Sequence, residues 1–300
     1  MTEDAVPTPG PARSLGRFLE IQTLGLNLAF ALAFLLLASD GRPSLWTLLW
    51  IVIAFVAARN AGHSFNRWTD RRLDARNPRT QDRALVTGRL SSTFALGFCA
   101  ANAAVLVLAA YLLNPLAFVL APVALVLVLG YSYTKRVTSF TTAFLGLVQA
   151  ITPAAVYIAV SGTLPVAVLL AVGGLLAWGT AFETIHSLGD VESDRELGLF
   201  SVPVRWGVPR SVRLVRVLHA TALVLLALFG VALHLTTAYF GALVVMAILV
   251  AVTDRDLARN PTHARVPFER HFALSALYLA GVALAVFLPL GPAWVFLAKP

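Results

Sequence analysis

Nine apolar segments divide the 300-residue chain, and they follow one another at nearly regular intervals. They cover residues 21–38, 45–58, 94–113, 116–130, 140–160, 164–185, 217–235, 238–252 and 272–290. Most approach the roughly 20 residues that a helix needs to cross a bilayer. A soluble core cannot bury this much apolar surface, since 58% of the residues are hydrophobic and only 13% are charged. Lipid offers no partners to unpaired backbone groups, so we predict an all-α polytopic membrane protein with nine transmembrane helices.

The connections between these segments alternate in character. Four are short and almost uncharged, whereas the other four, residues 59–93, 131–139, 186–216 and 253–271, carry most of the Lys and Arg. Together with the N-terminal tail, the basic connections hold 21 of the 23 cations. Because Lys and Arg collect on cytoplasmic loops, we predict that the tail and all four basic connections face the cytoplasm and that the C-terminus lies outside. The net charge of +8 is explained by this bias and does not indicate nucleic-acid binding.

The predicted organisation is one domain in the cytoplasmic membrane. Residues 1–18 are polar and rich in proline, and we expect them to form a disordered cytoplasmic tail. Residues 19–298 form a single transmembrane domain, with polar cytoplasmic connections at 59–93 and 186–216. A disulfide within the chain is excluded because Cys99 is the only cysteine. No sequence feature indicates an obligate protein partner.

Acidic side chains recur at helical spacing in two of the basic connections. Asn66, Asp70 and Asp74 are spaced i, i+4, i+8, so on a helix they share one face. Asp190 and Asp194 repeat the i, i+4 spacing 120 residues later. Two oxygen-rich faces on one side of the membrane suit Mg²⁺, which typically takes one or two carboxylates together with substrate phosphate. The alternative is that these acids are solvated charges paired with nearby arginines; the five side chains in two registered sets favour the metal site.

Cations near these acids suit a phosphate-bearing substrate. Arg79 and Arg83 follow the first acidic set, and Lys135 follows Tyr131 and Tyr133 at the end of the fourth segment. Arg and Lys are the usual partners of diphosphate oxygens. The positive-inside bias explains each of these cations equally well on its own.

These motifs resemble those of the UbiA superfamily of intramembrane prenyltransferases. Its N-x-x-x-D-x-x-x-D and D-x-x-x-D motifs are matched by Asn66/Asp70/Asp74 and by Asp190/Asp194. The surrounding loops and the segment Tyr131-Ser-Tyr-Thr-Lys-Arg136 are similar to the polyprenyltransferases of quinone biosynthesis. The resemblance implies nine helices around a central cavity that the two polar connections cap on the cytoplasmic side.

The resemblance also implies the chemistry. A polyprenyl group would pass from an allylic diphosphate to a hydroxy-aromatic acid, such as a 4-hydroxybenzoate or a dihydroxynaphthoate, through an allylic carbocation. Mg²⁺ would clamp the diphosphate, with Asn66, Asp70, Asp190 and Asp194 as ligands and Asp74 bound directly or through water. Lys135 with Arg79 or Arg83 would neutralise the remaining phosphate charge, and the rings of Tyr131 and Tyr133 would shield the cation.

Two further ionisable residues lie at the cytoplasmic end of the sixth segment. Where the family often has Asp and Tyr, this chain has Glu183 and His186. Ionisable groups at membrane depth are candidates for function, so we expect both to contact substrate. The alternative, a mutually satisfied pair at the interface, explains them equally well.

Three other functions fit parts of the pattern. A secondary transporter usually carries its ionisable site near the membrane midplane, whereas the acids here gather at one surface. A CDP-alcohol phosphotransferase needs one continuous motif that this sequence lacks. Within the superfamily, haem farnesylation and terpene cyclisation remain open, although the loops look more like those of the quinone enzymes.

Overall fold

The computed structural model describes residues 18, 24–261 and 263–288, and within them the only regular secondary structure is helical. Eight helices are long and apolar enough to cross a membrane, and a ninth apolar helix, α2, has 15 residues. Each predicted segment coincides with one of these nine helices, which confirms the predicted all-α membrane fold. The predicted tail and the C-terminus lie almost wholly outside the described residues. Phe18 is the exception, because it is buried and its ring contacts Phe94 and Phe98.

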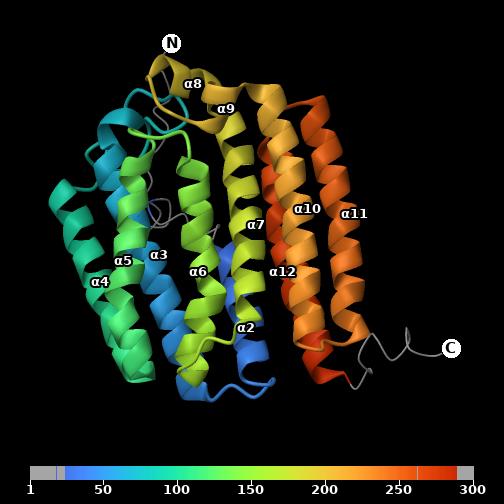
Figure 1. Ribbon diagram of the computed structural model, residues 1–300. Helices are drawn as coiled ribbons and strands as arrows, with labels where there is room; N and C mark the ends of the chain where they lie inside the picture. The colour runs from blue at the N-terminus through green and yellow to red at the C-terminus, as the bar shows by residue number, and fades with distance from the viewer. Residues whose placement is uncertain (1–17, 19–23, 262, 289–300) are drawn as a thin grey trace, which may run out of the picture.

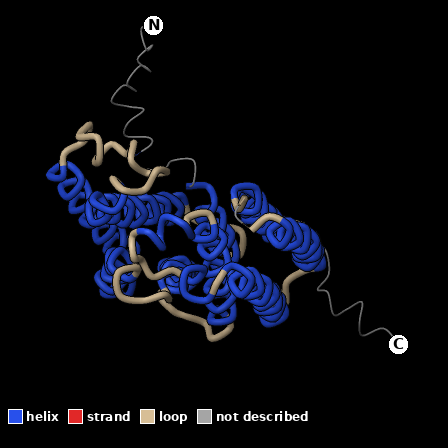
Figure 2. Tube along the Cα trace, turned by 90° about the horizontal axis from the view of Figure 1, so that it is seen from above, coloured by secondary structure: helices blue, strands red, loops and turns tan. Residues whose placement is uncertain are grey.

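The helices run up and down through one bundle (Figure 1). In chain order they are α2 (Leu24–Ala38), α3 (Leu45–Asp74), α4 (Ser92–Leu113), α5 (Pro115–Thr134), α6 (Thr141–Ser161), α7 (Val168–Leu188), α8 (Val191–Glu196), α9 (Val202–Trp206), α10 (Val208–Ala232), α11 (Thr237–Arg259) and α12 (Arg265–Phe287). Seen from above, most of them are viewed nearly end-on (Figure 2). The short helices α8 and α9 cover the upper end of the bundle (Figure 1).

Several helices extend beyond the apolar segments into polar sequence. The second apolar segment ends at residue 58, and α3 continues from it without a break to Asp74. The seventh segment was expected to start at residue 217, but α10 begins nine residues earlier, at Val208. Hydropathy marks only the lipid-facing part of a helix, since backbone hydrogen bonding continues through polar residues.

Side-chain caps mark the starts of three helices, α3, α4 and α5. Ser44 and Ser91 accept hydrogen bonds from the backbone N–H of Thr47 and Phe94, both at 3.0 Å. At the turn between α4 and α5, Asn114 accepts from the N–H of Ala117 at 2.9 Å. These caps satisfy N–H groups that a helix leaves unpaired in its first turn.

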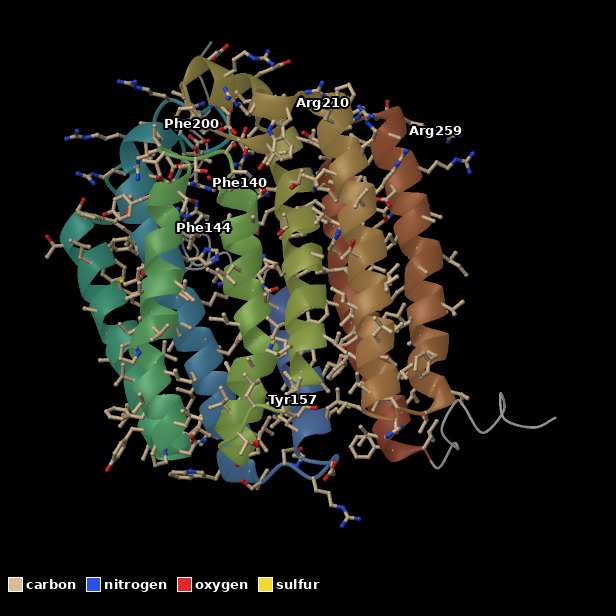
Figure 3. The ribbon with its side chains drawn as sticks, in the orientation of Figure 1. Phe140, Phe144, Tyr157, Phe200, Arg210 and Arg259 are labelled. Carbon is tan, nitrogen blue, oxygen red and sulfur yellow. The ribbon has the colours of Figure 1, made fainter. Side chains whose placement is uncertain are left out.

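The two ends of the bundle differ in charge. The connections that were identified as basic lie together at the upper end, where Arg210 and Arg259 are seen, while Tyr157 lies toward the lower end (Figure 3). The lower connections are short and almost uncharged: residues 162–167 carry no charged side chain, and residues 39–44 carry only Asp40 and Arg42. The acidic motifs and the cations that pair with them, described below, therefore lie at the upper end of the bundle.

Close packing at the centre fixes α6 against α7. A Cβ atom added to Gly146 of α6 would lie 2.7 Å from the backbone nitrogen of Thr180 in α7. Gly179 faces it, and a Cβ there would lie 2.9 Å from the Cα of Gly146. Small residues at such a crossing let two membrane helices approach closely. The contact holds the two helices that carry Gln149 and Glu183, discussed below.

Candidate active site

The polar half of α3 brings the first acidic set to a cavity of about 480 Å³. Asn66, Asp70 and Asp74 all line it, as the i, i+4, i+8 spacing predicts for one helix. Asp70 is 1% exposed and Asp74 is also buried. Because both carboxylates lie out of water, each requires partners of opposite charge.

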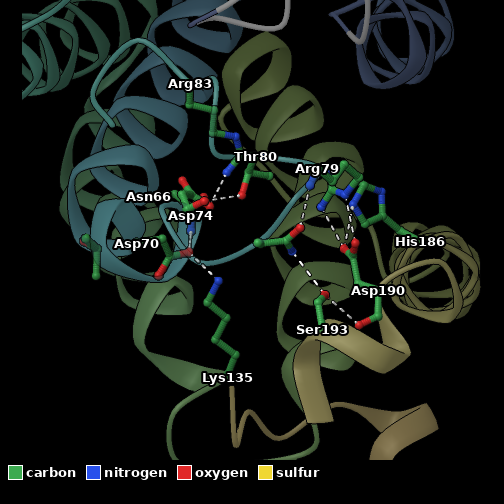
Figure 4. Close-up of polar contacts among 12 residues, drawn as sticks. Asn66, Asp70, Asp74, Arg79, Thr80, Arg83, Lys135, His186, Asp190 and Ser193 are labelled. Carbon is green, nitrogen blue, oxygen red and sulfur yellow. Dashed lines mark hydrogen bonds and ion pairs between the residues drawn. The ribbon is translucent and has the colours of Figure 1, made fainter. Parts of the chain in front are cut away.

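Asp70 is held by three donors, and two of them, Asn66 and Lys135, are labelled in Figure 4. Asn66 Nδ2 donates to Oδ2 at 2.9 Å, and Lys135 Nζ lies 2.6 Å from the same oxygen. Arg136 Nη2 binds Oδ1 at 2.9 Å. The end of α5 is therefore tied to the middle of the acidic set on α3.

Asp74 and Asp190 are paired with the two predicted arginines. Arg83 Nη1 lies 2.6 Å from Asp74 Oδ1. Arg79 binds Asp190 with two parallel hydrogen bonds, from Nε to Oδ1 at 2.8 Å and from Nη2 to Oδ2 at 2.7 Å. The loop that follows α3 thus links the first acidic set to the second, with the two-pronged geometry that Arg favours toward carboxylates.

The second acidic set begins where α7 ends. Asp190 precedes the first residue of α8 and Asp194 lies within that helix, and both line the cavity. Burial raises the pKa of the Asp194 carboxyl, and the nearby charge of Asp190 adds to this rise. Ser193, between them, donates to the Asp190 backbone oxygen at 3.1 Å and accepts from Asn77 Nδ2 at 3.2 Å. A bond from the Phe200 N–H to the Lys135 backbone oxygen, 3.1 Å, fixes the following loop over the site.

Five oxygen-bearing side chains from the two motifs line the one cavity. Within the described part of the chain, no three His, Cys, Asp or Glu residues gather closely enough to hold a metal ion. Three of the four motif carboxylates, those of Asp70, Asp74 and Asp190, are instead paired with cations. Carboxylate and amide oxygens with adjacent cations are a donor set that suits a hard divalent ion shared with a phosphate ligand.

Of the two predicted tyrosines, only one faces this cavity. Tyr131 is part of the lining, whereas Tyr133 is 47% exposed and packs beside Phe65. Residues two apart on a helix point to different sides, so α5 cannot direct both rings inward. The structure therefore brings Tyr131 to the site and leaves Tyr133 outside it.

Glu183 and His186 both line the cavity from α7, about two turns and one turn before Asp190, respectively. Glu183 accepts a hydrogen bond from Gln149 Nε2 at 3.0 Å, which joins α7 to α6. His186 Nε2 lies 3.7 Å from Asp190 Oδ2.

Two lining arginines were not among the predicted site residues. Arg67 is 5% exposed and faces the cavity from α3, and it lies three residues before Asp70 on the same helix face. Arg59 was assigned to a basic connection, but it belongs to the continuous helix α3 and lines the cavity well below Asp70. Both residues could have been predicted from helical spacing, because they lie three and eleven residues before Asp70 and so share its helix face. They were instead counted only as part of the positive charge of a loop.

The cavity continues down the bundle between apolar walls. The part that lies below Arg59 on α3 and below Thr152 on α6, which we call the lower slot, is lined by Ile51, Phe55, Leu106, Leu113, Ala155, Val156 and Ala159. Ala155 is exposed although it lies in the middle of a helix, because it borders this slot. The site thus joins a charged upper end to an apolar lower end.

Comparisons with known proteins agree with this arrangement. Residues 27–274 match the family described as the UbiA prenyltransferase family. A 4-hydroxybenzoate octaprenyltransferase from Nitrosomonas eutropha is 31% identical over 250 residues, which are 83% of this chain and 87% of that protein. The enzyme of the same name from Xanthomonas oryzae pv. oryzae is 32% identical over 251 residues, covering 84% and 81%.

Solved structures share the fold. The apo structure of a UbiA homolog from Aeropyrum pernix K1 superposes with a TM-score of 0.80 at 28% identity, covering 88% of this chain and 98% of that one. A UbiA homolog from Archaeoglobus fulgidus, bound to DMAPP and Mg²⁺, has a TM-score of 0.69 at 18% identity, covering 91% and 99%. With its two acidic motifs facing one cavity of a helical membrane bundle, the chain is an enzyme that belongs to the UbiA prenyltransferase family.

Proposed function

We propose that the protein transfers a polyprenyl group from an allylic diphosphate to a hydroxy-aromatic acid, in a reaction that depends on Mg²⁺. The observation that carries the proposal is that both acidic motifs and their cations face the charged end of a cavity whose other end is apolar. A diphosphate with a long hydrocarbon tail matches this cavity, because it is charged at one end and apolar at the other. The names of the relatives support a 4-hydroxybenzoate-like acceptor, and the Archaeoglobus fulgidus homolog supports an allylic diphosphate with Mg²⁺.

The residues fit a divalent metal ion as carboxylate and amide donors. Asn66, Asp70, Asp190 and Asp194 would hold Mg²⁺, with Asp74 bound directly or through water. When bound, the ion would neutralise the diphosphate and make it a better leaving group. Lys135 and Arg79 now pair with Asp70 and Asp190, each within 2.8 Å. With metal held by these acids, Lys135 and Arg79 would be available to the diphosphate oxygens.

The acceptor would bind in the polar part of the cavity below the acids. Arg59 and His63 line it from α3, and Glu183 lines it from α7 with Gln149 as its partner. The guanidinium of Arg59 suits the carboxylate of an aromatic acid, and Glu183 can accept a hydrogen bond from its hydroxyl group. That hydrogen bond would increase the electron density at the ring carbon that attacks the allylic cation.

The reaction proceeds by ionisation and electrophilic substitution. The allylic C–O bond breaks and the diphosphate leaves with the electron pair, while Lys135 and Arg79 stabilise its charge. A ring carbon of the acceptor donates its electrons to the cation, and the proton displaced from that carbon passes to Glu183. The face of the Tyr131 ring stabilises the cation until the bond forms. The apolar walls exclude water, which would otherwise capture the cation as an alcohol.

The upper end of the bundle would face the cytoplasm, where the soluble acceptor is available. The positive-inside bias supports this orientation in the cytoplasmic membrane.

The test uses purified protein, a long allylic diphosphate and a panel of hydroxy-aromatic acids, with Mg²⁺ or with EDTA. We expect a C-prenylated product only with Mg²⁺, detected by mass spectrometry. Release of prenyl alcohol and diphosphate alone would contradict the acceptor class while retaining the ionisation step. Folded protein that neither binds nor turns over the diphosphate would overturn the proposal.

A further inference from the structure

We infer that the lower slot measures the donor tail, and that Ala155, Ala159 and Leu113 set the number of isoprene units the enzyme encloses. The inference rests on the proposed function and adds the length of the donor to it. It would make the protein selective among allylic diphosphates that share one headgroup and differ only in tail length.

The slot offers a tail nothing but hydrocarbon. Among the described residues that line the cavity, all those below Arg59 on α3 and below Thr152 on α6 are apolar. An aromatic acid buried there would leave its carboxylate without a partner, which is costly. Of the two substrates, the end of the prenyl chain has the most apolar surface to bury, so its binding free energy gains most from this environment.

Two side chains tie the helix ends together at the bottom of the slot. Asn114 Nδ2 donates to the backbone oxygens of Ile158 and Ala159, at 2.7 and 3.1 Å, and so fixes the α4–α5 turn to the end of α6. Trp46 Nε1 donates to the backbone oxygen of Leu112 at 3.2 Å and fixes the start of α3 to the end of α4. These bonds hold the three helices whose side chains form the floor.

The depth of the cavity gives the length of the tail. Asp70 and Ile51 both line it, and the nineteen helical steps from one to the other along α3 correspond to about 28 Å. An isoprene unit adds four C–C bonds of about 1.5 Å to the main chain, or about 5 Å when extended. The cavity therefore encloses about five units, and the outer units of a longer donor must leave it.

Two alanines on α6 mark two depths of the lower slot. Ala155 and Ala159 lie one turn apart on the cavity-facing side of the helix, a separation of about 6 Å. This separation is close to the length of one isoprene unit. A large side chain at Ala159 would fill the floor, and the same side chain at Ala155 would stop the tail about one unit higher.

The experiment compares kcat/KM for donors of two to eight isoprene units with one hydroxy-aromatic acceptor. For the wild-type protein we expect kcat/KM to rise up to about five units and to change little beyond. In Ala159→Phe the limit should fall by about one unit and in Ala155→Phe by about two. Each unit that is no longer enclosed removes several buried carbon atoms, so the five-unit donor should lose about tenfold or more.

Two variants separate the inference from a general loss of folding. Leu113→Ala deepens the floor, and it should raise kcat/KM for donors one unit longer than the wild-type limit. Ala251→Phe places the same new ring on the exposed face of α11, away from the cavity, and should leave the length profile unchanged.

The outcomes are distinguishable. A wild-type protein that turns over no donor would overturn the proposed function itself. Turnover of every donor with the same profile in wild type, Ala155→Phe and Ala159→Phe would overturn the inference and leave the proposed function standing. A graded shift in these variants, with the two-unit donor unaffected, supports both.

Discussion

At the scale of single residues, charge pairing holds the site together. Asp70 and Asp190 each line the cavity with a cation within 2.8 Å, so the negative charge of each is balanced, and that of Asp70 is also buried. Asp70→Asn or Asp190→Asn keeps the size and hydrogen-bonding shape of the side chain but removes a charged oxygen. We expect turnover to fall at least about a hundredfold, as when one preorganised charge-stabilising group is lost from an active site.

The control at this scale is Asp256→Asn. Asp256 is also ion-paired at the same end of the bundle, with Arg270 Nη1 at 2.6 Å, but it does not line the cavity. Its substitution should leave turnover nearly unchanged. All three variants are compared by initial rate and by thermal unfolding in detergent. Near wild-type activity in Asp70→Asn would rule out its assignment as a metal ligand.

At the scale of helices, the crossing of α6 and α7 positions the acceptor end of the site. Gly146→Ala places a methyl group 2.7 Å from the Thr180 nitrogen and 2.9 Å from the Leu176 oxygen, so the helices must separate. We expect a loss of ~1–3 kcal/mol in stability, the usual cost of overpacking. Turnover should also fall, because Gln149, one turn below Gly146, would move from Glu183. Gly241→Ala is the control, since its Cβ would meet open space. Equal thermal stability of the two variants would argue against the close crossing.

At the scale of the whole molecule, the charge asymmetry predicts the orientation in the membrane. Val137 and Val166 flank α6 at opposite ends and are 77% and 81% exposed. In a Cys99→Ala background, Val137→Cys should react with a membrane-impermeant maleimide only from the cytoplasmic side, and Val166→Cys only from the outside. Labelling is compared in intact spheroplasts and inverted vesicles. The reverse pattern would place the site on the outer face.

The sequence by itself determined the membrane class, the number and rough position of the apolar helices, and the shared face of Asn66, Asp70 and Asp74. These features are local: hydropathy depends on neighbouring residues, and the 3.6-residue period places side chains on a single helix. The resemblance of the motifs indicated the family before the bundle was seen. Extended helices such as α3, which carries polar residues to Asp74, were correspondingly harder to delimit.

Only the tertiary structure decided which side chains share the cavity. It brought Arg79 to Asp190, 111 residues away, and placed Arg59 inside the bundle rather than in a surface loop. It directed Tyr131 inward and Tyr133 outward, and it closed the lower slot with Asn114. These outcomes depend on how each helix is rotated and crossed against its neighbours. Such packing is settled by contacts between distant segments, which a local pattern does not contain.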